Sequence, residues 1–205
     1  MNYKWARDFT LQLINQYSKA GERVDPTYNG QSDDIVRIPA LLNDAQIYAA
    51  TAFPAGRIRT VDTLDAMPCK EKNNWNIYDL PKNFFQLCGG GLIRADGKDS
   101  MRFAGYRLIG RDALAIPKDA GTDFLVEYYR YPRVIGLEPE DTLELDNSLE
   151  VQAVLPYYVA AHLAADKDAF LYQVLMNEFE NRMTRMTIEP HVEIVSIEDS
   201  YGIRG

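Results

Sequence analysis

The feature that most constrains this chain is an apolar segment in its C-terminal third. From Ala153 to Ala165 the only polar side chains are those of Tyr157, Tyr158 and His162. A helix that is apolar on every face needs apolar neighbours all around it. The segment is too short to span a bilayer, which takes about 20 residues. A chain of this size seldom supplies neighbours on every side, so the segment favours a structural part of an assembly over an enzyme.

Other segments have helical periods. Apolar side chains recur at a spacing of four near the N-terminus, at Trp5, Phe9, Leu13 and Tyr17. A second helical pattern covers residues 32–52 and continues past Pro39, which predicts a kink there. A third covers residues 168–186, with one apolar and one polar face.

A further helix is expected to begin near Asn147 and to contain the apolar segment. Asn147 and Glu150 have the spacing of a capping box. Pro156 lies about two turns inside this helix and lacks an amide hydrogen. We therefore predict a bend near Gln152.

Between Arg57 and Arg133 the helical pattern is replaced by short runs rich in β-branched and aromatic residues, which alternate with turn residues. Residues 110–112 and 119–122 have the length of tight hairpin turns. Residues 80–87 begin on Leu-Pro and are predicted to form one or two helical turns between strands. A small antiparallel sheet is the simplest interpretation.

These patterns predict an α+β fold, in which a small bundle of about four helices carries an inserted antiparallel β region and an extended C-terminal arm. The expected divisions are N-terminal helices over 1–56, a β-rich insertion over 57–134, helices that complete the bundle over 135–186, and the arm over 187–205. At 205 residues the chain is long enough to form one substantial core.

Composition and motifs argue against several classes of function. A net charge of −8 is unsuited to a protein that grips nucleic acid through phosphate contacts. Cys69 and Cys88 form no CxxC pair, so we expect two free thiols and no zinc site. Charged residues at the N-terminus do not fit a signal peptide, which predicts synthesis in the cytoplasm.

No motif of catalysis is visible in the sequence. The Gly89–Gly91 run lacks the Lys-Ser/Thr of a phosphate loop, so a flexible turn is the preferred interpretation. His162 and His191 have no convincing acid, nucleophile or ligand partner near them in sequence. We therefore predict no catalytic, cofactor-binding or metal-binding residue.

Charges are unevenly distributed along the chain. Residues 138–150 contain carboxylates and no basic residue, including Glu138, Glu140 and Asp141, whereas the preceding β region carries Arg107, Arg111 and Arg130, among others. A solvated acidic edge is one interpretation. The alternative is a contact between subunits, in which the acidic connector of one copy faces the arginines of its neighbour. Tyr157 and His162 are the candidates for polar contacts between copies.

The C-terminal residues 187–205 contain one β-like run, at 191–197. This segment alone buries little, so it is either a frayed terminus or an arm that orders on a partner. The apolar residues expected to contact a partner are Val192, Ile194, Ile197, Tyr201 and Ile203.

In order and spacing, several pieces of the chain resemble the head–tail connector (adaptor or neck) proteins of tailed bacteriophages. The pieces are IPALLNDAQ at 38–46, YDLPKNF at 78–84, GTDFLVEYY at 121–129 and LPYYVAAHL at 155–163. The resemblance implies a virion protein of the neck without enzymatic activity. Its copies would form a ring of twelve beneath the portal protein and join the head to a tail or stopper protein. DNA would pass through the ring without sequence-specific binding, and a like-charged wall suits that passage.

Two alternatives remain. One is another component of the neck or tail, such as a stopper, tail-completion or tail-tube protein. The other is a soluble ligand-binding or hydrolytic domain that uses the tyrosine-rich strand around Tyr128 as a pocket wall.

Overall fold

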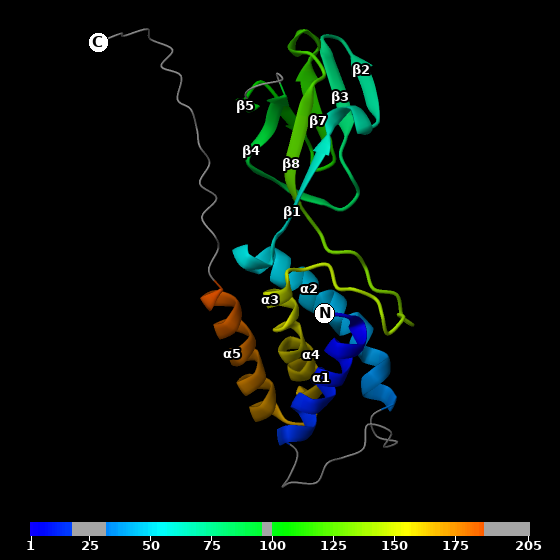
Figure 1. The fold of residues 1–205 in the computed structure, drawn as a ribbon, viewed down its shortest axis with the longest axis vertical. Coiled ribbons are helices and arrows are strands. Elements are labelled where there is room, and N and C mark those ends of the chain that lie inside the picture. Colours follow the sequence, from blue (N-terminus) through cyan, green and yellow to red (C-terminus); the bar gives the residue numbers. More distant parts are fainter. Residues whose placement is uncertain (18–31, 96–99, 187–205) are drawn as a thin grey trace, which may run out of the picture.

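The computed structural model describes residues 1–17, 32–95 and 100–186 of the chain. Helices form one part of the molecule and strands form the other, and the two parts are stacked along the long axis (Figure 1). The chain enters the β part after residue 57 and leaves it after Arg130.

Within the described ranges, five α-helices build the helical part. They are α1 (Tyr3–Tyr17), α2 (Ser32–Ala52), α3 (Leu149–Gln152), α4 (Leu155–Ala164) and α5 (Ala169–Arg185). The helical periods correctly predicted α1, α2 and α5. Helix α2 is continuous through Pro39, and α5 buries Leu171, Leu175, Phe179 and Met183 along one face.

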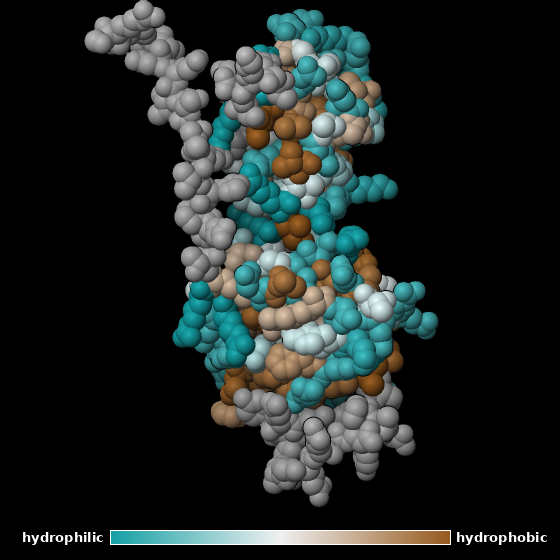
Figure 2. All heavy atoms as spheres, viewed as in Figure 1, coloured by the Kyte–Doolittle hydropathy of each residue, from teal (hydrophilic) through white to brown (hydrophobic). Residues whose placement is uncertain are grey.

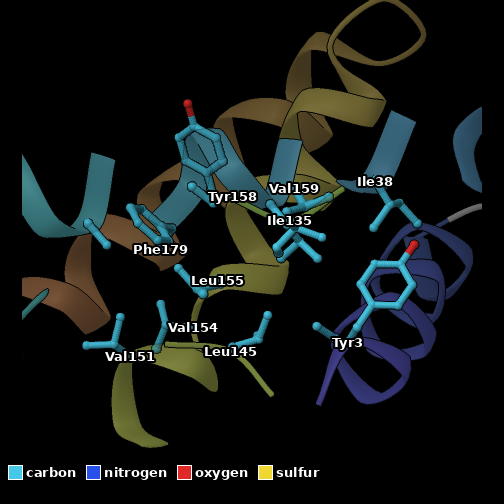
Figure 3. Close-up of a cluster of buried hydrophobic side chains, with 14 of the residues drawn as sticks. Tyr3, Ile38, Ile135, Leu145, Val151, Val154, Leu155, Tyr158, Val159 and Phe179 are labelled. Atoms are coloured by element: carbon cyan, nitrogen blue, oxygen red, sulfur yellow. The ribbon is translucent and has the colours of Figure 1, made fainter. Parts of the chain in front are cut away.

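The apolar segment forms α4, which lies at the centre of the helical part. Helices α1, α2 and α5 all pack against α4, and eight of its ten residues are buried. Figure 3 shows Leu155, Tyr158 and Val159 of α4 among buried residues that come from other elements, such as Ile38 and Phe179. The chain therefore supplies by itself the neighbours that were expected to require an assembly, because three of its own helices surround this one.

Pro156 separates two helices instead of bending one. Helix α3 ends at Gln152, and α4 begins at Leu155 with Pro156 in its first turn, where an amide hydrogen would have no helical partner. The N-cap of α3 is also one residue later than predicted. Ser148 Oγ accepts a hydrogen bond from Val151 N, and Asn147 instead donates from Nδ2 to Gly56 O.

The β part contains two antiparallel sheets of four strands each. The first has the order β1 (Ile58–Thr63), β8 (Phe124–Arg130), β4 (Phe84–Ala95) and β5 (Ser100–Phe103). The second has the order β2 (Cys69–Lys72), β3 (Trp75–Asp79), β7 (Ala113–Pro117) and β6 (Arg107–Ile109). Three short 3-10 helices lie between these elements, at Pro54–Gly56, Leu64–Ala66 and Lys118–Ala120.

The two sheets enclose a core of their own. Val126 and Leu92 from the first sheet pack in one cluster with Leu114 and Ile116 from the second, and Leu64 of the connecting 3-10 helix joins them. All five side chains are fully buried. The β part is therefore held together by its own apolar contacts.

The prediction of a helical bundle with one small inserted sheet is wrong. Two four-stranded sheets with a separate core make the β part a major layer of an α+β fold. The differences lie in residues 80–87, predicted as helical turns, and in Gly89–Gly91, predicted as a flexible turn. Most of these residues belong to the twelve-residue strand β4, whose register against β8 shifts between Leu87 and Leu92. Residues on both sides of this shift pair with β8, and Gly89–Gly91 lie within the irregularity between them, so the pairing of the flanking residues overrides the local preference for turns.

Only one of the two predicted hairpin turns joins neighbouring strands. Gly110 adopts a φ of 65° in the turn between β6 and β7, as a tight hairpin requires. Residues 119–122 lead from β7 to β8, and these strands belong to different sheets. The second turn is therefore a crossing between the sheets.

Candidate functional site

The connector from Tyr131 to Asn147, which leads from the β part back to the helices, contains the structure's most distinctive polar contacts. Arg130 at the end of β8 donates to Asp146 through Nη1 at 2.5 Å and Nη2 at 3.1 Å. The same carboxylate accepts the backbone amide of Arg133 at 2.9 Å. The Asp146 side chain is only 7% exposed. These bonds close the connector into a loop against the sheet.

The electrostatics of this ion pair follow from its geometry. The hydrogen bonds from Arg130 lower the pKa of Asp146 to about 2, although burial acts in the opposite direction. The pKa of Arg130 is raised for the same reason. Both groups remain charged over the whole neutral range.

Asn43 on α2 holds the connector at a second point. Its Nδ2 donates to Ile135 O at 2.8 Å, and its Oδ1 accepts the amide of Ile135 at 2.7 Å. The Ile135 side chain is buried in the helical core. Val134 thus lies between two anchored residues, Arg133 and Ile135.

Two apolar side chains of the connector nevertheless lie in solvent. Val134 is 81% exposed and Leu137 is 82% exposed. They are the most exposed large apolar residues in the described part of the chain. Figure 2 shows that polar and apolar side chains are mixed over both parts of the face in view, so exposed apolar atoms alone are unremarkable. What distinguishes Val134 is an anchored backbone on either side.

The acidic residues of the connector are divided between internal and external roles. Asp141 accepts a hydrogen bond from Arg7 Nη1 of α1 at 2.8 Å. The backbone of the same stretch pairs with the N-terminus, where Tyr3 N donates to Leu143 O at 2.7 Å. Glu138 and Glu140 are exposed on the surface. The segregated charges therefore do meet, but Asp141 and Asp146 meet arginines of their own chain.

The predicted arginines occupy different environments. Arg130 is engaged within its own chain, as described above. Arg107 on β6 is exposed, and its guanidinium carbon lies 4.9 Å from the centre of the Trp75 ring. Arg111 is exposed in the turn that follows β6. The last two are accessible to a partner, and their role as subunit contacts stays a prediction.

The predicted polar residues of α4 are partly covered by aromatic neighbours. Tyr157 makes an edge contact with Phe9 of α1, and Arg182 of α5 lies 4.4 Å from its ring centre. His162 contacts the rings of Tyr158 and Tyr172. Burial lowers the pKa of His162, which keeps the imidazole neutral at pH 7. Within one chain these residues serve as packing between helices.

The structure does not place the residues predicted for the C-terminal arm. The arm residues Val192, Ile194, Ile197, Tyr201 and Ile203 lie outside the described residues.

In the described ranges, no group of three or more His, Cys, Asp or Glu residues has the arrangement of a metal site. An open hollow of about 390 Å³ lies beside Met1, Asn2 and Trp5. Cys69 and Cys88 are free thiols, as predicted.

Sequence reasoning missed the anchors of the connector. Asn43 and Asp146 have no motif around them, and their importance follows from contacts across 92 and 16 residues of sequence. The charge segregation was a usable signal for Asp146, since it placed arginines opposite acids. No local signal identifies Asn43.

None of the described helices combines the length and the apolar composition that a membrane-spanning segment requires.

Comparisons with known proteins add no family assignment. The chain matches no protein-family model and no curated protein.

Proposed function

We propose that this chain is a structural subunit of a bacteriophage neck, a head–tail connector whose copies form a ring beneath the portal protein. In this role it joins the capsid to the tail, surrounds the DNA channel and performs no reaction. The proposal begins from the resemblance of four ordered sequence pieces to such proteins. The site of the chain's activity is then a set of protein contact surfaces.

One observation carries the proposal, namely the exposure of Val134 and Leu137 on an anchored connector. An apolar side chain in solvent is unfavourable by about 1.5–3 kcal/mol relative to the same side chain buried. A flexible loop could fold such a side chain inward, but bonds to Asp146 and Asn43 restrict the backbone around Val134. An apolar contact that is preformed in this way needs little ordering on binding. This supports a protein partner at the connector.

The charges around this surface also suit a neck protein. Glu138 and Glu140 are exposed beside the apolar pair and would repel the phosphates of DNA. The net charge of −8 acts in the same direction. DNA would then pass the ring without being bound.

The test is assembly with a portal protein of the same virus. We expect the purified chain to form a ring-shaped complex with the portal, measured by light scattering and electron microscopy. Val134→Asp combined with Leu137→Asp should reduce assembly strongly. The control is Val61→Asp, which places one such charge at a residue 50% exposed on β1, away from the connector. Normal assembly of the double variant would contradict the assignment of the connector surface.

The same experiment separates the alternatives. A stopper or tail protein would bind a tail component and ignore the portal. A chain that ignores both and binds small molecules would contradict a structural role altogether.

A further inference from the structure

The two outer strands of the second sheet differ in a way that bears on binding. Strand β2 carries Lys70, Glu71 and Lys72, all exposed. Strand β6 carries Leu108 and Ile109, which are 47% and 46% exposed. Among the described residues, each of these strands pairs on one side only.

An edge strand leaves backbone amide and carbonyl groups unpaired, and another chain can add to them. Natural proteins commonly protect such edges with charged residues, especially Lys. Strand β2 is protected in this manner. Strand β6 carries two exposed apolar side chains, Leu108 and Ile109, beside one charged residue, Arg107, and therefore has the character of an acceptor for an added strand.

The charges beside β6 indicate which kind of strand would fit. Arg107 begins the strand and Arg111 follows it, and both are exposed. An acidic strand with apolar side chains would complement Leu108 and Ile109 as well as the two guanidinium groups.

A segment of this composition follows α5 in the same sequence. Residues 188–199 contain four acidic residues and no Lys or Arg, the four being Glu189, Glu193, Glu198 and Asp199. The same segment contains the β-branched residues Val192, Ile194, Val195 and Ile197, which favour strands.

We propose that residues 191–197 of one copy add as a strand to the β6 edge of a second copy. The backbone ladder would provide affinity, and the pairing of acidic residues with Arg107 and Arg111 would select the partner and its orientation. The proposal rests on the proposed function only in that copies of the chain meet. It requires no portal protein.

The first test mixes two full-length variants. Leu108→Lys with Ile109→Lys removes the acceptor, and Val192→Asp with Ile194→Asp removes the donor. Each variant alone should stay monomeric in native mass spectrometry, whereas the wild type associates as its concentration rises. An equimolar mixture should form a one-to-one pair, because each variant keeps the half that the other has lost. Association of either variant alone, or a mixture without pairs, would overturn the proposal.

The second test measures the contact directly. A fluorescent peptide of residues 188–199 should bind the Val192→Asp, Ile194→Asp variant, which lacks the donor strand and keeps the β6 acceptor. Fluorescence anisotropy measures the affinity. Adding Leu108→Lys and Ile109→Lys should weaken binding by about tenfold or more. Val61→Lys, a single substitution by lysine on the edge strand β1, should change affinity by less than about twofold. The Leu108→Lys, Ile109→Lys variant and the Val61→Lys control must both retain the wild-type circular dichroism and melting temperature.

Salt provides a further check, since charge pairing at an exposed edge is screened. Affinity for the peptide should fall as sodium chloride rises from 20 to about 300 mM. Equal binding to the Lys variant would overturn the choice of β6. Peptide binding without pairs in the mixture would place the strand on its own chain and overturn the second-copy assignment. Neither result would contradict the connector proposal, which is tested separately with the portal.

Discussion

Arg130 and Asp146 connect the last strand of the β part to the start of the returning helices through two hydrogen bonds, at 2.5 and 3.1 Å. The contact joins residues 16 positions apart and encloses the connector between them. Asp146 is nearly buried, so the pair is screened weakly by solvent.

Asp146→Ala should therefore lower the free energy of unfolding by about 2–4 kcal/mol, because it leaves the Arg130 charge partly buried without its acid. The control is Asp141→Ala, which removes the exposed pair with Arg7 and should lower it by less than about 1 kcal/mol. Urea unfolding at pH 7 measures both. Equal effects of the two substitutions would show that burial of Asp146 is unimportant.

The same carboxylate predicts a dependence on pH. Its pKa is about 2 in the folded chain and about 3.9 in an unfolded one. A lowered pKa stabilises the fold above the unfolded value, and the stabilisation is lost as pH falls from about 4 to about 2. The difference in unfolding free energy between wild type and Asp146→Ala should shrink by about 2 kcal/mol over this window. A constant difference from pH 5 to pH 2 would contradict the assignment.

Phe179→Ala should be among the most destabilising changes in the helical part. Phe179 is fully buried and contacts the rings of Tyr48, Phe53 and Tyr158. Its loss should lower the free energy of unfolding by about 3–5 kcal/mol. Phe170→Ala on the same helix removes a ring that is 76% exposed and should change it by less than about 0.5 kcal/mol. Thermal unfolding followed by circular dichroism distinguishes them.

Gly56 lies where the chain leaves α2 for the β part. A Cβ atom at this position would lie 2.1 Å from Ala49 O, so Gly56→Ala forces the backbone apart. We expect a loss of about 1–3 kcal/mol in unfolding free energy. Gly136→Ala is the control, since a Cβ there meets no atom within 4 Å. If Gly56→Ala left the free energy of unfolding unchanged, α2 and the 3-10 helix after it would separate easily.

The two thiols should differ in reactivity. Cys69 is exposed on β2, while Cys88 is buried on β4, and burial raises the pKa of the Cys88 thiol. Because the thiolate is the reactive form, iodoacetamide at pH 8 should modify Cys69 at least about tenfold faster. In 8 M urea, where burial is lost, the rates should converge to within about twofold. Mass spectrometry of the peptides reads out both rates.

Periodicity predicted α1, α2 and α5 because each of these helices has one face toward a core. The stripes of α1 and α5 are visible in sequence, and Leu13 and Leu175 are buried as expected. Strand β4 was missed because its Gly89–Gly91 run resembles a turn locally. The residues on either side of this run pair with β8, which lies 30 or more residues away along the chain. Likewise β2, with the sequence CKEK, has no apolar face to reveal it.

The sequence predicted which kinds of residue interact at the candidate site, but it did not predict where the connector places them. Segregated charges indicated that acids and arginines meet, and Arg130 with Asp146 does so. Whether they meet within one chain or between two depends on the path of the connector, which the sequence pattern does not contain. The path follows from single contacts such as Asn43 with Ile135.

The enclosure of α4 by α1, α2 and α5 has a consequence for how copies are made and used. Since no second copy is needed to bury α4, the Leu108→Lys, Ile109→Lys variant, whose copies should not associate, should have a midpoint of unfolding that is independent of protein concentration. Folding and assembly are then separate events. A single copy can therefore complete its helical core before it meets any other chain.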